Sequence, residues 1–517
     1  METSRDLYWD DFDAGEVHIR DQWQFELKSE FFPTTAKSNE YTQEFYFFIP
    51  NALQINEENY SKQQFYLDQT NLFRYKTPIF TFKQLLDPDN EDSPLTRLVR
   101  ISRQTNPIDE EHCSDELKLL ANIIRSSLRN TIKELHLALN RSVELEGDHF
   151  RPFIMRTDQL LSDIQQLQEI YFGLKIKMME RLSNSLLSRQ FTYIEEFIGD
   201  AILHYLSRLL EEVRSVRDPQ LQETDEKITA MLLKEKKFEG LYIASNQQKS
   251  DMTENIEDES IVYRTSLLNK FVISALQLTT KRFSMDQKYQ HLISGISAGI
   301  AMLIYFCLFV WLGTIFVINS EPFIMLIVIV YVLKDRIKDW LRTFSFFYLH
   351  TLKWFPDYTT IIQSPDRRVC LGKVSEFFSF IDPEQLAPEI GSLRHSGFHN
   401  VLETYQRPEQ IIFYKRIVTI HNFPKKLDIR RCGLNIIFRF NVHQFLHKAS
   451  DPNEVHLTLD PLTKDLVNVR LPKVYHLNMI IRTGFQSKEQ KDLIEIKKIR
   501  LIIDRTGIRR IEQLHRL

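Results

Sequence analysis

The stretch at residues 292–318, LISGISAGIAMLIYFCLFVWLGTIFVI, runs for 27 residues without a charged side chain. A helix needs about 20 apolar residues to cross the roughly 30 Å of hydrocarbon in a bilayer, so this run is long enough even when tilted. A core helix of a water-soluble protein would carry a polar face. The stretch therefore predicts a transmembrane helix.

A second apolar run follows a polar break. The tetrapeptide NSEP at 319–322 precedes residues 323–333, which are apolar up to Lys334. This run is too short to span alone, but its proline favours a first helical turn and the helical pattern continues, so Lys334 and Arg336 can snorkel to the headgroups. The sequence predicts a two-span transmembrane hairpin over 291–333. A re-entrant dip that returns to the same side is the alternative.

Basic residues flank both runs, and the connecting loop has none. They are Lys281, Arg282 and Lys288 before the first run, and Lys334, Arg336, Lys338 and Arg342 after the second. By the positive-inside rule, both termini are expected in the cytoplasm of a multi-pass protein of the plasma (inner) membrane. The acidic start, METSRDLYWDDFDAGEV, has no apolar core, so a cleaved signal peptide is not expected.

Small residues crowd the first half of the first run. They are Ser294, Gly295, Ala298, Gly299 and Ala301. The two glycines form a GxxxG pattern, which lets membrane helices approach closely. The pattern has two uses: packing within the chain's own hairpin, or association of several chains. We expect a homo-oligomer.

Apolar spacing predicts the elements outside the hairpin. Three- and four-residue steps predict helices near 117–139, 160–182 and 194–209, and alternation predicts strands at 17–27, 44–50 and 63–67 and six more between 409 and 512. No helix breaker lies between residue 261 and Gly295, so one helix is expected to run into the first span.

These patterns divide the chain into seven segments. They are a β-rich N-terminal module (1–110), a helical bundle or coiled-coil region (114–245), an acidic mobile loop (246–260), a membrane-approaching helix (261–290), the hairpin (291–333), a basic and aromatic interfacial helix (334–356) and a basic domain (357–517). The last domain is expected to be an antiparallel β-sandwich or barrel. The fold class is a multidomain α+β membrane protein.

The net charge of −3 hides an asymmetry. Residues 1–290 hold 35 Lys and Arg against 48 Asp and Glu, whereas residues 361–517 hold 26 against 17. Two ordinary domains of opposite pI explain this. Alternatively, the halves attract each other, or the basic domain faces anionic lipid or nucleic acid. The four scattered cysteines form neither a disulfide framework nor a zinc pattern.

Catalytic motifs for nucleotides, zinc proteases and hydrolases are absent from the sequence. Two weak constellations remain. One consists of the i,i+4 histidine pairs His395/His399 and His443/His447; the other is Asp492 with Glu495 and Lys497, an arrangement that metal-dependent nucleases use. Ordinary surface and core residues explain both, so no catalytic residue, metal or cofactor is predicted.

The layout at residues 256–333 is similar to that of CorA-type magnesium channels, in which a cytoplasmic domain feeds a long helix into a two-span hairpin. That family's Gly-Met-Asn loop is missing here, where Asn319-Ser320-Glu321 stands, so no residue role is transferred. The first functional hypothesis is a membrane-anchored scaffold or sensor that binds protein partners or lipid headgroups. An oligomeric channel or membrane-perturbing effector is second, and an enzyme such as a nuclease is third.

Overall fold

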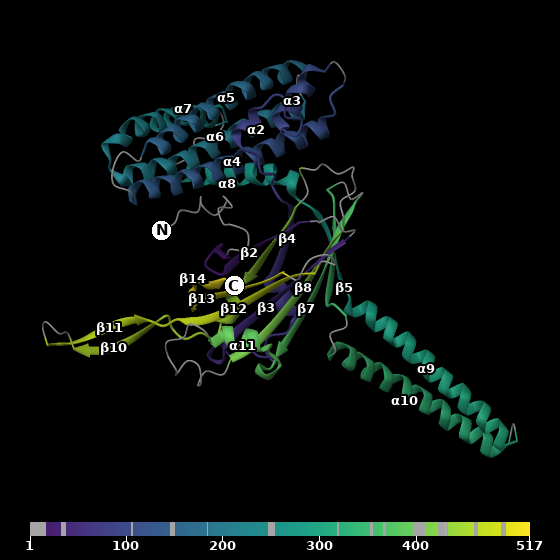
Figure 1. Cartoon of the computed structure of the whole chain (residues 1–517). Coiled ribbons are helices and arrows are strands. Elements are labelled where there is room, and N and C mark those ends of the chain that lie inside the picture. The colour runs from purple at the N-terminus through teal and green to yellow at the C-terminus, as the bar shows by residue number, and fades with distance from the viewer. Residues whose placement is uncertain are drawn as a thin grey trace. The chain divides into compact units, whose positions relative to one another are not determined.

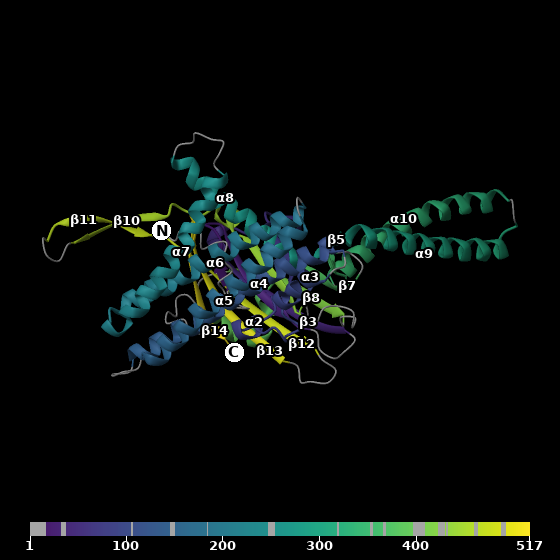
Figure 2. The ribbon, with the colours of Figure 1, turned by 90° about the horizontal axis from the view of Figure 1, so that it is seen from above.

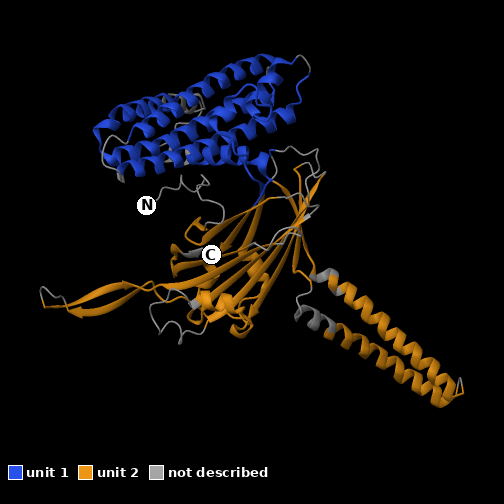
Figure 3. Cartoon of the chain, viewed as in Figure 1, with its two compact units in different colours: residues 1–13, 74–277, 425–435 blue, residues 14–73, 278–424, 436–517 orange. Residues whose placement is uncertain are grey.

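The computed structural model describes residues 17–32, 38–104, 107–144, 150–182, 185–246, 254–317, 320–351, 355–365, 369–395, 409–421, 430, 433–459, 464–486 and 493–516. The chain divides into two units (Figure 3). Unit 1 contains residues 1–13, 74–277 and 425–435, and unit 2 contains residues 14–73, 278–424 and 436–517.

Unit 1 is built from helices (Figure 1). They are α2 (Phe82–Leu86), α3 (Pro94–Arg103), α4 (Glu110–Glu144), α5 (Arg151–Arg181), α6 (Leu186–Val216), α7 (Gln222–Asn246) and α8 (Glu254–Ile273). The three predicted helices are confirmed as α4, α5 and α6. Their periodic apolar side chains are buried, including Leu120, Ile164 and Phe197. Burial of one apolar stripe on each helix stabilises such a bundle.

The expected helix from residue 261 into the first span is wrong. Helix α8 begins earlier, at Glu254, inside the segment expected to be a loop, and ends at Ile273. A 3-10 turn and strand β5 (Thr279–Ser284) follow before the next helix begins at Asp286. The β-branched Thr279 and Thr280 favour a strand, and β5 pairs along its length with β6 (Tyr358–Gln363).

Unit 2 contains the sheets. Besides β5 and β6, the strands are β1 (Val17–Ile19), β2 (Gln24–Phe31), β3 (Ser38–Pro50), β4 (Gln69–Tyr75), β7 (Cys370–Ile381), β8 (Glu409–His421), β9 (Leu434–Asn441), β10 (Asn453–Leu459), β11 (Leu466–Pro472), β12 (Tyr475–Gln486), β13 (Leu493–Asp504) and β14 (Gly507–Arg516). One sheet has the order β1-β2-β9-β4 and another β14-β13-β12-β3-β8-β7-β6-β5; β10 and β11 pair only with each other. The six C-terminal strands predicted from alternation are confirmed as β8 to β13.

Strand β3 lies at the centre of the larger sheet, between β12 and β8. The N-terminal and C-terminal β segments, expected as separate modules, therefore share one sheet. Both faces of β3 are covered, since Phe45 and Phe47 belong to the main core and Tyr46 and Phe48 to a smaller cluster. A strand buried on both faces needs neighbours on both edges, which the distant C-terminal strands supply.

The main core lies between the two sheets and is rich in aromatic rings. Phe45 of the larger sheet stacks on Phe438 of the smaller one at 4.9 Å between ring centroids. Phe65 also belongs to this core. The strand predicted at 63–67 is wrong: these residues form helix α1 (Lys62–Asp68), which begins where the Ser61 hydroxyl accepts a hydrogen bond from the Gln64 amide.

Helices α9 (Asp286–Ile315) and α10 (Glu321–Thr351) form a hairpin inserted between the paired strands β5 and β6. Figures 1 and 2 both show the two helices side by side. The helix predicted to continue past residue 334 is confirmed. Among the described residues, one helix segment, 291–315, is long and apolar enough to cross a membrane. The finding hints at membrane association, whereas the two-span arrangement stays a prediction.

Candidate membrane hairpin and its root

The hairpin is held together by contacts that fix the register of its two helices. Tyr305 and Phe309 of α9 meet Tyr331 and Phe323 of α10, with ring centroids 6.1 and 6.0 Å apart. The buried residues of α9 lie on one face: Ile293, Ser297 and Ala301 recur at four-residue steps, and Leu312 follows about three turns later. This spacing places one face of α9 against α10.

The outward surface of the hairpin is apolar and exposed. On α9 and the residues after it, Leu303, Trp311 and Val317 are more than half exposed, and Val317 reaches 81%. On α10, Met325 is 71% exposed and Ile329 61%. A core helix of a soluble protein would bury such residues, whereas only 17% of the apolar window of α9 is buried. The surface suits contact with lipid chains.

The predicted small residues divide between two sides of α9. Ala301 is buried, and Ser294 and Ala298 are half-buried. Gly295 and Gly299 are exposed, and a Cβ added at either one would meet nothing within 4 Å. Close packing within the hairpin therefore does not require the two glycines.

The predicted basic residues are not equivalent. Lys281 and Arg282 lie in strand β5, and the Lys288 side chain is outside the described residues. The other four lie on α10: Lys334, Arg336, Lys338 and Arg342. The Lys334 ammonium lies 3.9 Å from the Tyr331 ring centroid, and Arg342 is 4.0 Å from the Asp339 carboxylate.

The root of the hairpin, residues 285–289 and 355–357, is fixed to the larger sheet. Ser284 pairs with Tyr358 at the end of the β5–β6 ladder. Just beyond it, the Met285 amide donates to the Asp357 carbonyl at 3.0 Å, and Tyr289 stacks on Phe355 at 3.9 Å. The helical hairpin thus replaces the turn of a β-hairpin.

Arg282 joins this root to a buried carboxylate. Its guanidinium lies 4.2 Å from the Tyr358 ring centroid and 3.2 Å from the Glu376 carboxylate. Glu376 also accepts hydrogen bonds from the Tyr414 hydroxyl at 2.7 Å and from the side-chain amide of Gln69 at 3.0 Å. Burial and the nearby Glu376 charge raise the pKa of Tyr414 well above its ordinary value, so Tyr414 acts as a neutral donor.

The polar row is the set of directly paired residues that crosses five strands of the larger sheet: Tyr358, Glu376, Arg416, Gln43 and Thr483. Arg416 is fully buried and donates to Gln43 at 2.6 Å, to Asn71 at 3.0 Å and to Ser29 at 3.2 Å. Burial lowers the pKa of Arg416 to about 10, so it stays charged at neutral pH. The row links the hairpin root to the sheet centre.

Asp357 provides a second anchor. Its carboxylate accepts hydrogen bonds from Lys62 at 3.0 Å, from the Tyr66 hydroxyl at 3.0 Å and from the Phe378 amide at 2.8 Å. Sequence reasoning missed Asp357, Glu376 and Arg416. The available signal was a charge in a mostly apolar strand, as in Arg416 of QIIFYKRIVTI, a segment that was predicted only as a strand.

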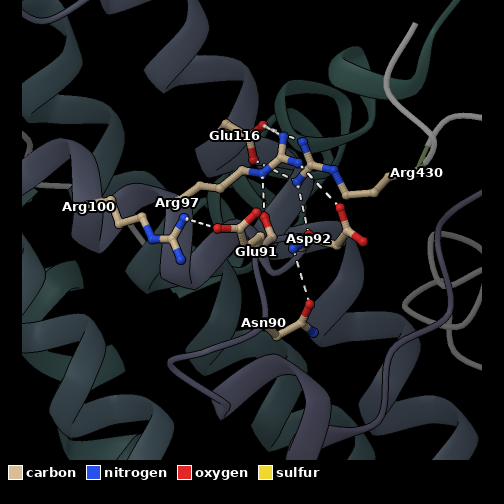
Figure 4. A network of polar contacts seen from close by, with 7 residues as sticks. All are labelled: Asn90, Glu91, Asp92, Arg97, Arg100, Glu116 and Arg430. Atoms are coloured by element: carbon tan, nitrogen blue, oxygen red, sulfur yellow. Dashed lines mark hydrogen bonds and ion pairs between the residues drawn. The ribbon is translucent and has the colours of Figure 1, made fainter. Parts of the chain in front are cut away.

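Unit 1 has its own buried ion pair (Figure 4). Arg430 and Glu116 form a bidentate pair with both side chains buried, and Arg97 lies 3.6 Å from the same carboxylate. Arg97 pairs with Asp92, and Arg100 pairs with Glu91, both in the loop between α2 and α3. The cluster therefore fixes Arg430 to the bundle.

The described members of the two weak constellations form no metal-binding group. The His443 and His447 rings are 4.8 Å apart, and Glu495 pairs with Lys497 at 3.2 Å. His399, Asp492 and the His395 side chain lie outside the described residues. Over the part of the chain that is described, no group of three or more metal-binding side chains occurs. The chain matches no protein family, no curated protein and no solved structure.

Proposed function

We propose that this protein is a membrane-anchored scaffold or sensor whose α9–α10 hairpin inserts into the bilayer. The observation that carries the proposal is the exposed apolar surface on both helices. A helix satisfies its backbone hydrogen bonds internally, so a helical hairpin can enter hydrocarbon without leaving polar groups unpaired. In water the same surface would favour aggregation.

The hairpin places both of its ends on the cytoplasmic side. The basic residues of β5 and of the second half of α10 lie toward the root, whereas the distal loop has none. The two-span arrangement in the plasma (inner) membrane is the topology that we propose. The units carried by the root then lie in the cytoplasm, where they bind protein partners or anionic headgroups.

Self-association is part of this proposal. Gly295 and Gly299 face outward on the part of α9 nearer the root, beside the charged part of α10, and leave a face on which a second α9 helix fits closely at the membrane surface. The same face favours the second candidate function, an oligomeric channel or membrane-perturbing effector. Sizing the wild type and Gly295→Leu/Gly299→Leu in one detergent tests the face: assembly of the wild type alone supports it, and equal assembly contradicts it.

Vesicle flotation of the full-length protein tests the anchor. Ile329→Arg places a charge on the exposed distal part of α10, which costs about 2.5–3.5 kcal/mol near the bilayer centre and lowers partitioning about 70- to 300-fold. Leu457→Arg on β10 is the matched control, because this residue is equally exposed but lies outside the hairpin. Wild-type protein that fails to float, or equal flotation of both variants, would contradict the proposal.

A further inference from the structure

We infer that the hairpin is matched to a hydrocarbon layer of only about 20 Å, so that it crosses a bilayer where the bilayer is thin or becomes locally thinned. This inference rests on the proposed membrane anchorage. Glu321 begins α10 and Lys334 is the next charged residue along it. At 1.5 Å per residue, these two charges are separated by about 20 Å, against roughly 30 Å of hydrocarbon in an ordinary bilayer.

The partner helix does not extend the apolar layer. The Lys334 ammonium lies 5.9 Å from the Tyr305 ring centroid, which places it level with the middle of α9. The part of α9 that precedes Tyr305 runs beside the charged part of α10, because the helices are antiparallel. Although residues 291–315 form an apolar segment, the hairpin as a whole is apolar on both helices only beyond the level of Lys334.

The charges from Lys334 onward would lie in hydrocarbon if the hairpin crossed an ordinary bilayer. They are Lys334, Asp335, Arg336, Lys338 and Asp339. Asp335 and Asp339 are more than half exposed, so the hairpin does not shield them. Burying several exposed charges in this way is costly, and local thinning of the bilayer is the usual response.

Side-chain direction opposes escape by snorkelling. Helical side chains tilt toward the N-terminus of their helix, and the N-terminus of α10 is the tip of the hairpin. The Lys334 ammonium accordingly lies over Tyr331, which is nearer the tip, and also 3.4 Å from the carboxylate of the adjacent Asp335. The same tilt directs Glu321 away from the apolar layer toward the far headgroups.

The test compares binding of the full-length protein to vesicles of dimyristoleoyl-, dioleoyl- and dierucoylphosphatidylcholine, whose hydrocarbon layers increase in thickness. We expect partitioning to fall at least about tenfold from the thinnest to the thickest. A leucine variant, Lys334→Leu/Asp335→Leu/Arg336→Leu/Lys338→Leu/Asp339→Leu, lengthens the apolar layer and should shift the optimum to a thicker bilayer. The matched control keeps every charge by exchanging Lys for Arg, Arg for Lys and Asp for Glu at the same five positions. It should keep the wild-type preference for thin bilayers.

Each outcome has one meaning. A wild-type optimum in the thinnest vesicles, lost in the leucine variant but kept in the control, supports the inference. Binding that is independent of thickness, or strongest in the thickest vesicles, overturns the inference and leaves the membrane anchor standing. If neither the wild type nor the leucine variant binds any of the vesicles, the proposed anchorage itself fails.

Discussion

Two hairpins extend from unit 2, and both expose apolar side chains. One is the helical hairpin α9–α10; the other is the β10–β11 ribbon, residues 453–459 paired with 466–472 (Figure 1). Every described residue of the ribbon strands is exposed, including Val455, Leu457 and Leu471. By exposure alone the two features are alike.

Their backbones differ in a way that decides which hairpin can enter a membrane. The helices of α9–α10 bond their own peptide groups, whereas the two-stranded ribbon pairs only within itself and leaves both outer edges open. The ribbon also mixes polar residues into both faces, such as His456 on one and Arg470 on the other. Exposed apolar residues therefore indicate a membrane segment only where the backbone is satisfied internally.

Removal of each hairpin in turn should give the largest effect. Replacing residues 286–355 by Asn-Gly leaves Met285 and Asp357 to close a short loop at the end of the β5–β6 ladder. We expect loss of all vesicle flotation with little change in thermal stability. Replacing 454–471 by Asn-Gly joins the paired Asn453 and Pro472 and should leave flotation intact.

The two deletions test directly which of the two hairpins binds the membrane. If the protein without α9–α10 still floats with vesicles, the sheets or the ribbon bind lipid. If the ribbon deletion abolishes flotation while its thermal melting stays unchanged, the open-edged ribbon contributes to membrane binding and the backbone argument fails. Circular dichroism of both variants checks that the sheets are still folded.

The sequence predicted correctly those helices and strands whose formation depends on the pattern within a single segment. The charge-free run at 292–318 predicted α9, and alternation predicted β8 to β13. Pairing between distant segments had no local signal. Nothing within residues 38–50 indicates that β3 pairs with β12 and β8, because strand neighbours depend on the whole sheet.

The candidate site shows the same limit. Lys334 and the small residues were identified from the sequence alone. The position of Lys334 beside Tyr305 was not predicted, because it depends on the register of the two helices. Arg416 was missed because nothing near it in the sequence indicates its partners. It lies on the face of β8 that the smaller sheet covers, where Asn71 of β4 and Ser29 of β2 accept its hydrogen bonds.

Substitution of one buried and one exposed arginine tests whether the sheet at the root of the α9–α10 hairpin is rigid. Arg416→Met leaves Gln43 and Asn71 without their buried donor and removes a charge near Glu376, so we expect a loss of about 3–5 kcal/mol in the free energy of unfolding. Arg336→Met, an exposed change on α10, should stay within about 0.5 kcal/mol. Chemical denaturation measures both.

The loss of stability in Arg416→Met shows whether the polar row stabilises the sheet. A large loss for Arg416→Met alone shows that the polar row stabilises the sheet from which the helical hairpin extends. A loss below about 1 kcal/mol would mean that the row relaxes or hydrates when its arginine is removed, and the root would then not be rigid. The slope of the denaturation curve should stay unchanged, because the surface exposed on unfolding is the same.

The smallest expected effect concerns the ribbon itself. Val455 lies directly opposite Arg470, so Val455→Glu creates an opposite-charge pair across the two strands and Val455→Lys a like-charge pair. Cross-strand pairs contribute about 0.2–1 kcal/mol, so the ribbon amides should exchange hydrogen about two- to fivefold faster in the lysine variant. Hydrogen exchange read by mass spectrometry measures this difference, and added vesicles should protect α9–α10 but not the ribbon. Equal exchange in both variants would show that something other than cross-strand pairing, such as a covering partner chain, holds the ribbon together, because an isolated two-stranded ribbon is marginal in water.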